Sequence, residues 1–231
     1  MCGRFTRFQS WKELRDTYRL VMDDPPEGFR PRFNVAPGQR IELAASRADG
    51  TRGFGAMRWG LVPAWAKDEQ IGYKMINARS ETVAEKPAFR TAFQRRRCIV
   101  PASGFYEWQA GEAKHKQPFH FTRADGDLLS FAGLWEKWDG GTEPLYSFTI
   151  LTAAANETMA AYHHRMPVIL ERAAINRWLD PQTPPETLMP LFAPARDDVL
   201  QASPVSRDVN RVANDNPALI TPIKDELNLL F

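Results

Sequence analysis

A cysteine at position 2 has the most distinctive chemistry in this chain. If Met1 is removed, Cys2 becomes the N-terminus and carries an amine and a thiol on neighbouring carbons. The α-amine has an ordinary pKa of about 7.7–8.0, against about 10.4 for lysine, so part of it is neutral near pH 7. Such an amine forms a Schiff base with an aldehyde, and the thiol then closes on the imine to give a thiazolidine, an intramolecular step. A chance cysteine in a disordered terminus is the alternative.

Asn77 and Arg79 fall where an extended segment meets a helical one. Backbone N–H groups of the turn that follows could face an anion there. Turn formation and a solvated surface explain the same two residues when the segment is taken alone.

Glu107 lies among aromatic residues in a predicted strand, on the same face as Phe105 and Gln109. A carboxylate in an apolar cleft has a raised pKa and can carry protons near neutral pH. A strand face that is simply solvated is the alternative.

His163 and His164 are adjacent in a chain that has only four histidines. Imidazole is the side chain best suited to proton transfer at neutral pH. Adjacent histidines diverge, and neither an acidic residue nor a cysteine stands at a useful spacing, so we expect no metal site. A solvated His164 without a function is expected, and His163 is the sharper candidate once a family resemblance is added.

The composition indicates a globular protein. With 231 residues, a net charge of +2 and 43% hydrophobic residues, the chain can bury one good core and is not a polycation. No apolar run approaches the ~20 residues of a membrane span, and arginine and lysine interrupt the N-terminus where a signal peptide would be apolar. We therefore expect a cytoplasmic protein without a membrane segment. Its two cysteines give no disulfide framework, and Cys98, in an apolar run, is expected to be a buried structural thiol.

Strands dominate the predicted secondary structure. Ser10 and Glu13 form a capping box for a first helix with apolar residues up to Val21. Branched and aromatic residues predict strands, and short helices are expected between some of them, whereas 64–73 reads as an irregular loop. These elements favour an α+β fold with a mostly antiparallel, barrel-like sheet in a single domain spanning 1–231, with a core of about 2–222. The predicted strands are 40–45, 52–62, 97–102, 105–109, 118–122, 128–135, 146–153 and 167–170, with a final strand after 200. The later helices are a short stretch that begins at Ser80, and 87–94, 156–162 and 173–179.

Taken together, several short motifs resemble the SRAP family, the SOS-response-associated peptidase-like proteins that crosslink to abasic sites in single-stranded DNA. Each motif is weak alone, but their joint order and spacing make the match specific, from Cys2 to about 222. The motifs occupy residues 1–5, 32–37, 58–63, 77–82, 97–101, 104–108, 163–167 and 204–207.

The resemblance implies a role for each catalytic candidate. Cys2, freed of Met1, would condense with the ring-opened aldehyde of an abasic deoxyribose. Asn77 would hold the linkage by hydrogen bonding, and Glu107 would move protons during Schiff-base and thiazolidine formation. His163 would assist opening of the closed sugar.

The resemblance also implies contacts with DNA. Arg4, Arg79 and Arg165 look like phosphate contacts. Asn34 would help to shape the site. Trp65 would wedge against or stack on bases, with core packing as the alternative.

Two other functions remain open. The family name suggests a Cys2-dependent peptidase, although only Met1 precedes Cys2 here and offers no long leader to cleave. A reversible single-strand binding module without chemistry is the other alternative. A Schiff base also permits β-elimination, so a weak lyase activity could accompany crosslinking. We expect no cofactor and a monomer whose partner is single-stranded DNA containing abasic sites.

Overall fold

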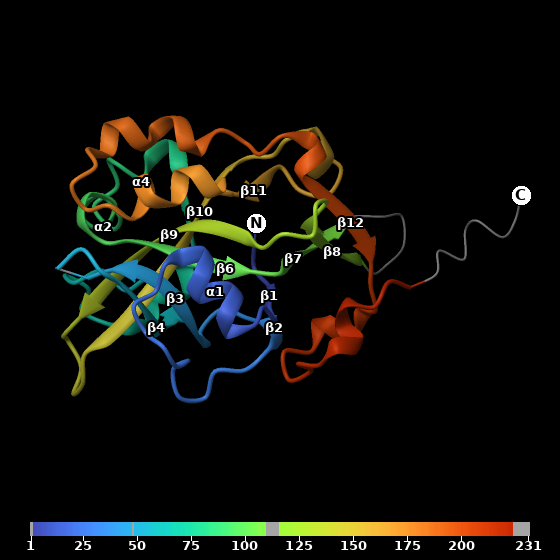
Figure 1. The fold of residues 1–231 in the computed structure, drawn as a ribbon, viewed down its shortest axis with the longest axis horizontal. Coiled ribbons are helices and arrows are strands. Elements are labelled where there is room, and N and C mark those ends of the chain that lie inside the picture. Colours follow the sequence, from blue (N-terminus) through green and yellow to red (C-terminus); the bar gives the residue numbers. More distant parts are fainter. Residues whose placement is uncertain (1, 48, 110–115, 224–231) are drawn as a thin grey trace, which may run out of the picture.

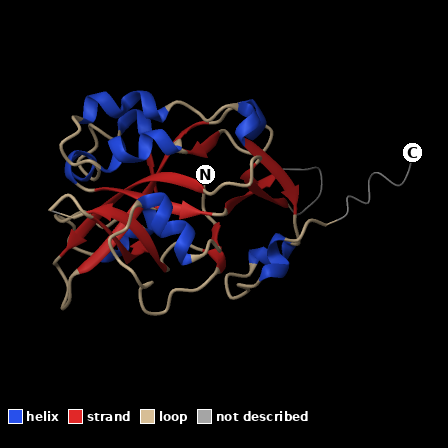
Figure 2. Ribbon diagram, viewed as in Figure 1, coloured by secondary structure: helices blue, strands red, loops and turns tan. Residues whose placement is uncertain are grey.

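Two β-sheets account for most of the regular structure in this computed structural model, which describes residues 2–47, 49–109 and 116–223 (Figures 1 and 2). In chain order the strands are β1 (Phe5–Arg7), β2 (Arg32–Val35), β3 (Arg40–Ser46), β4 (Arg52–Trp59), β5 (Asn77–Arg79), β6 (Arg97–Ala102), β7 (Gly104–Gln109), β8 (Gln117–Arg123), β9 (Leu129–Trp138), β10 (Leu145–Ala154), β11 (Arg165–Pro167) and β12 (Leu200–Pro204).

The second of these sheets closes on itself. Within the described residues, the first sheet has the order β12-β8-β7-β1-β2 and the second has the order β11-β10-β4-β3-β6-β9. An additional pairing between β9 and β10 joins β10, β4, β3, β6 and β9 into a barrel. Neighbouring strands run antiparallel, except that β10 runs parallel to β4 and to β5 among the pairings described. This closure leaves β5 and β11 attached to β10, where they carry candidate site residues.

Short helices flank the sheets: α1 (Trp11–Tyr18), α2 (Arg90–Arg95), α3 (Glu157–Ala160) and α4 (Ile175–Leu179). The predicted capping box is present at the start of α1, where the side chains of Ser10 and Glu13 each accept a hydrogen bond from the other's backbone N–H. The helix ends at Tyr18 because Arg19 adopts a left-handed conformation with φ of 54°. The predicted continuation to Val21 is therefore wrong, and Val21 is exposed.

Both faces of the barrel strands β6, β9 and β10 are buried over most of their length. Ile99, Ala132 and Leu151 pack on the side covered by α1, α2 and α4, and α2 and α4 lie together at the upper left of Figure 1. Their neighbours Val100 and Ile150 point to the opposite face, which packs against residues of the first sheet. Burial on both faces explains why these strands read as nearly continuous apolar runs.

The predicted fold class is confirmed: a mostly antiparallel, barrel-forming sheet with a few short helices. Cys98 is fully buried, as expected. The strand predicted to reach residue 62 ends at Trp59, because Gly60 turns the chain with φ of +120°. The segment predicted as an irregular loop contains the 3-10 helix η1 (Glu69–Lys74).

The short strands β1 and β2 were not predicted from the sequence, and β5 was expected only as an extended segment. The strand predicted at 167–170 lies earlier in the chain, as β11 at Arg165–Pro167. No helix in the described part of the chain has the length and apolar character needed to cross a lipid bilayer.

Candidate functional site

Cys2 lies just before β1 and is fully buried. Its side chain belongs to the apolar cluster that contains Phe5 and Phe105. Burial and the nearby Glu107 carboxylate raise the pKa of the Cys2 thiol, and a hydrogen bond from the backbone N–H of Arg4 only partly offsets them. The sulfur is therefore held as a thiol rather than a thiolate near neutral pH.

Asn77 begins β5, and its side chain reaches Cys2. Its Nδ2 donates a hydrogen bond to the Cys2 carbonyl oxygen at 2.9 Å. Pairing with β10, where Asn77 lies opposite Ile150, fixes the position of this strand. The Oδ1 atom of Asn77 is buried and accepts no hydrogen bond from the described residues. A buried oxygen without a donor costs about 1–3 kcal/mol, so an incoming donor would be stabilised at this point.

Glu107 occupies β7 and is 5% exposed. Strand alternation places it on the same face as Phe105, which packs in the cluster containing Cys2. Burial raises the pKa of the Glu107 carboxyl above its ordinary value. The alternative of a solvated strand face is wrong, and Glu107 has the environment expected of a proton carrier.

His163 lies between α3 and β11 and is half-buried, with its ring stacked on that of the exposed His164. The backbone N–H of Arg165 donates to His163 Nδ1 at 2.9 Å. The same Nδ1 lies 3.2 Å from the Arg165 carbonyl oxygen, so both contacts hold the ring against the backbone of Arg165. Burial lowers the pKa of His163, which favours the neutral ring near pH 7.

The guanidinium of Arg165 is already engaged within the protein. Its two terminal nitrogens bind the two carboxylate oxygens of Glu81, at 2.5 Å and 2.9 Å. The second of these nitrogens also donates to the Thr152 carbonyl oxygen. A phosphate at Arg165 would therefore have to share this group with Glu81.

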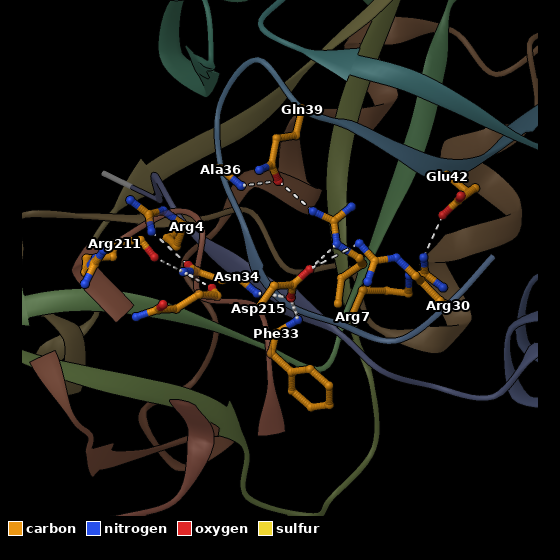
Figure 3. Close-up of polar contacts among 12 residues, drawn as sticks. Arg4, Arg7, Arg30, Phe33, Asn34, Ala36, Gln39, Glu42, Arg211 and Asp215 are labelled. Atoms are coloured by element: carbon orange, nitrogen blue, oxygen red, sulfur yellow. Dashed lines mark hydrogen bonds and ion pairs between the residues drawn. The ribbon is translucent and has the colours of Figure 1, made fainter. Parts of the chain in front are cut away.

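Arg4 and Asn34 meet in a polar network that fastens residues 206–216, here called the C-terminal strap, to β2 (Figure 3). Arg4 Nη1 donates to Asn34 Oδ1 and to the Val209 carbonyl oxygen, both at 2.8 Å. Asn34 is fully buried, and its Nδ2 donates to three strap carbonyl oxygens, those of Val209, Arg211 and Asn214. Both side chains therefore bind protein atoms rather than facing solvent.

Asp215 closes the same network from the strap (Figure 3). Its Oδ1 accepts from the backbone N–H of Phe33 at 2.5 Å and of Asn34 at 3.1 Å, and its Oδ2 lies 2.6 Å from Arg32 Nε. Burial alone would raise the pKa of Asp215, but these hydrogen bonds and the arginine charge outweigh it and hold the pKa below its ordinary value. The strap is therefore anchored by a carboxylate that stays ionised.

Trp65 and Arg79 face outward. Trp65 is 59% exposed, so the core-packing alternative for this residue is wrong. Arg79 is exposed at the end of β5, two residues after Asn77, and pairs with no acidic side chain among the described residues. These two side chains are the ones best placed to meet a ligand in solution.

The sequence candidates thus fall into three groups. Cys2, Asn77 and Glu107 come together, and His163 lies on a segment whose flanking residues Tyr162 and Met166 pack in or against the Cys2 cluster. Arg4, Asn34 and Arg165 are held in internal networks, whereas Trp65 and Arg79 are exposed. The described residues contain no group of three or more His, Cys, Asp or Glu side chains that could hold a metal ion.

Two residues of these networks escaped the sequence analysis. Glu81 lies inside a recognised motif, at 77–82, and an acidic residue between two candidate basic groups was the available signal. Asp215 had none, because its partners at 32–34 lie more than 180 residues away in the chain.

Comparison with known proteins places this geometry in a family. The family model for SOS response associated peptidase (SRAP) matches residues 1–212. The chain is 44% identical over 222 residues to the abasic site processing protein YoqW of Bacillus subtilis, covering 95% of this chain and 99% of that protein. It is 36% identical over 229 residues to the abasic site processing protein HMCES of Gallus gallus, covering 85% and 67% of the two chains.

Among solved structures, a protein from Bacteroides thetaiotaomicron superposes with a TM-score of 0.86 at 25% identity, over 96% of this chain and all of that chain. The match of sequence family, relatives and fold extends over most of the chain. This protein belongs to the SRAP family.

Proposed function

We propose that this protein processes abasic sites in DNA by forming a covalent thiazolidine with Cys2, once Met1 has been removed. The observation that carries the proposal is the hydrogen bond from Asn77 to the carbonyl of a buried Cys2, which packs in one cluster with Phe105, on the strand face that also carries the buried Glu107. Relatives named abasic site processing proteins, at 36–44% identity, agree with this chemistry.

The first step joins the Cys2 amine to the sugar. In its closed form the abasic sugar hides its aldehyde. Neutral His163 would take the proton of the C1 hydroxyl as the ring opens, and the resulting imidazolium would give a proton to the ring oxygen, which becomes a hydroxyl. The amine nitrogen then attacks the aldehyde carbon and water leaves, which gives a Schiff base. Asn77 holds the Cys2 carbonyl, and its buried Oδ1 would accept a hydrogen bond from the reacting nitrogen.

The second step closes the ring. The Cys2 sulfur adds to the imine carbon, the C=N electron pair passes to nitrogen, and the thiol proton has to leave. Because the Cys2 pKa is raised, the thiol does not lose this proton unaided. Glu107 would take it and return a proton to the nitrogen, which completes the thiazolidine, since a carboxyl with a raised pKa exchanges protons closer to neutral pH.

The exposed candidates would make the DNA contacts. Arg79 would pair with a phosphate, and Trp65 would stack on a base. Arg4 and Asn34 would shape the site by holding the chain next to Cys2. A splayed, unpaired strand fits a buried Cys2 better than a duplex, so we propose single-stranded DNA as the substrate, and a cytoplasmic monomer as the acting form.

A Cys2-dependent peptidase remains the second candidate because of the family name. Its nucleophile would have to be a thiolate, which burial and Glu107 both disfavour at Cys2. A weak lyase activity is compatible with the Schiff base, because the imine acidifies the neighbouring sugar carbon.

The test mixes protein from which Met1 has been removed with a single-stranded oligonucleotide bearing one abasic site. The products are resolved on a denaturing gel. A heat-stable shifted band is expected with the wild-type protein and with Cys98→Ala, which removes the other buried cysteine. The band is expected to vanish with Cys2→Ala and with a variant that keeps a residue before Cys2. No band with the wild-type protein would refute the proposal. Cys2-dependent peptide hydrolysis would favour the peptidase, and a salt-sensitive shift indifferent to Cys2 would leave a binding module.

A further inference from the structure

The ion pair between Glu81 and Arg165 differs from an ordinary surface pair. The Arg165 side chain is 11% exposed, whereas that of Glu81 is 51% exposed. Both terminal nitrogens of the guanidinium bind the carboxylate, which is the two-pronged geometry of the stronger Arg–carboxylate pairs. Because the Arg165 charge is largely buried, separating it from the Glu81 carboxylate would be costly. The pair therefore fixes Arg165 in one orientation.

This pair joins two segments of the site. Glu81 lies in the 3-10 helix η2 (Ser80–Thr82), directly after the strand that carries Asn77. On the other side, the backbone N–H of Arg165 donates to His163 Nδ1 at 2.9 Å. The segment 77–81 therefore binds the Cys2 carbonyl through Asn77 at one end. At the other end, Glu81 binds Arg165, whose backbone contacts the His163 ring.

Arg165 is itself tied down from a third direction. Its Nη2 donates to the Thr152 carbonyl oxygen on β10, the strand that pairs with both β5 and β11. Moving the guanidinium would break contacts with two elements at once. Glu81 and the Thr152 carbonyl together therefore fix Arg165 relative to β10 and to the segment 77–81.

We propose that Glu81 is a positioning residue for the reaction at Cys2, and that it acts through Arg165 by fixing where His163 presents its Nε2. The inference rests on the proposed function, because the reaction it serves is the capture of an abasic site. It assigns Glu81 no contact with the substrate. Its importance follows from geometry, since a reacting group displaced by about 1 Å can lose about a hundredfold in rate.

The variant Glu81→Gln keeps the shape of the side chain and removes its charge. Crosslinking is measured in a single turnover with saturating abasic-site oligonucleotide. We expect crosslinking by Glu81→Gln to be slower than by the wild type by about tenfold or more, which is less than the loss expected from a 1 Å displacement of His163. The non-covalent affinity for the same oligonucleotide is measured with Cys2→Ala added to the wild type and to Glu81→Gln, and it is expected to stay unchanged.

Glu69→Gln is the matched control. Glu69 is also 51% exposed and pairs with Arg58 at 2.9 Å, but Arg58 belongs to β4 and not to the His163 segment. Its crosslinking rate is expected to match the wild type. The second comparison places Glu81→Gln in a His163→Ala background, where it should cause no further loss.

Three results would overturn the inference: a wild-type rate in Glu81→Gln, an equal further loss in the His163→Ala background, or tighter DNA binding by Glu81→Gln. The last would mean that Arg165, once released, binds a phosphate. If a thermal melt shows that Glu81→Gln does not fold, Glu81→Asp, which keeps the charge and shortens the reach, takes its place in every comparison. Failure of the wild-type protein to crosslink would instead refute the proposed function.

Discussion

Asp215 fastens the C-terminal strap to β2, and Asp215→Asn tests how much this anchor contributes. The carboxylate accepts two backbone N–H groups through Oδ1 and meets Arg32 Nε through Oδ2 at 2.6 Å. Asparagine can keep the first oxygen, but its amide nitrogen would then face the Arg32 donor. The substitution therefore removes the ion pair with Arg32, whose two side chains are each 15% exposed, and a longer one of 3.8 Å with Arg30, which is 66% exposed and contributes little.

The expected loss of stability follows from the contact between Asp215 and Arg32. A hydrogen bond to a charged group contributes about 1.5–3 kcal/mol, and this one is largely shielded from water. We expect Asp215→Asn to lower the free energy of unfolding by about 2–3 kcal/mol. At about 2–4 °C per kcal/mol for a chain of this size, Tm should fall by about 4–12 °C.

Hydrogen exchange gives a second readout, because the strap can detach while the barrel stays folded. The amides of Phe33 and Asn34 donate to Asp215, so their exchange reports the opening of this contact directly. A loss of 2–3 kcal/mol corresponds to about 30- to 140-fold faster exchange at these two amides. Amides of the barrel strands are expected to keep wild-type rates.

The pH dependence has a definite sign. The pKa of Asp215 is lowered in the folded protein, so its contribution is complete above the unfolded pKa of about 3.9 and is lost as pH falls through the folded value. The difference between wild type and Asp215→Asn should therefore shrink below about pH 4.

Asp198→Asn is the control for this experiment. Asp198 pairs with Arg196 two residues away, and the two side chains are 63% and 81% exposed, so solvent screens the pair and Tm is expected to stay at the wild-type value. The reasoning is refuted if Asp215→Asn keeps the wild-type Tm and amide exchange, or if its deficit is undiminished at pH 3.

Three further predictions concern the site. Gly104→Ala would place a Cβ 2.4 Å from His120 Nε2, so we expect a loss of about 1–3 kcal/mol in a denaturant titration, against little change for Gly55→Ala, whose Cβ would meet nothing within 4 Å. Glu107→Gln should slow crosslinking more than it weakens DNA binding. The wild-type rate should fall as pH drops through the raised pKa of Glu107, and the rate of Glu107→Gln should not show this fall. Equal losses of rate and affinity would contradict a proton-carrier role. Trp65→Ala should weaken binding to single-stranded DNA by about 1–3 kcal/mol in a fluorescence titration while leaving Tm unchanged, since its side chain is 59% exposed; an unchanged affinity would exclude stacking.

Elements with strong local signals could be predicted from the sequence. The capping box of Ser10 and Glu13 is a contact within one turn. The long strands β9 and β10 could be predicted because they carry apolar residues on both faces. The error at Val21 has a local cause that the spacing of apolar residues could not reveal. Arg19 turns left-handed, which lets the Leu20 N–H reach the Arg15 carbonyl and ends the helix.

The short strands that position the site could not be predicted in this way. β5 has three residues of mixed polarity, and it is a strand only because β10 supplies partners more than 70 residues later in the chain. β1 and β2 are likewise short and pair with each other across a loop that holds α1. Asn77 and Arg79 could be nominated from a motif, but the contact between Asn77 and Cys2 required the fold.

The sequence was more successful with the direction of side chains than with their partners. Alternation along β7 put Glu107 on the face of Phe105, and that face packs with Cys2. The same reasoning could not show that Arg165 is paired with Glu81, because 84 residues separate them. An arginine in a motif therefore indicates a positive charge, but not whether that charge remains available to a phosphate.

The N-terminal aminothiol proposed for this protein poses a structural problem that the networks of this fold address. Chain termini usually fray, and a frayed Cys2 would react slowly and with any aldehyde. Here Cys2 is held by contacts from distant parts of the chain: Asn77 binds its carbonyl, and Arg4, two residues on, is fixed by Asn34 and by the Val209 carbonyl of the strap. Since the Arg4 contact spans 205 residues, the site next to Cys2 is complete only after the strap has docked. The anchor at Asp215 should therefore affect crosslinking as well as stability, because it sets how long the segment around Cys2 stays in place.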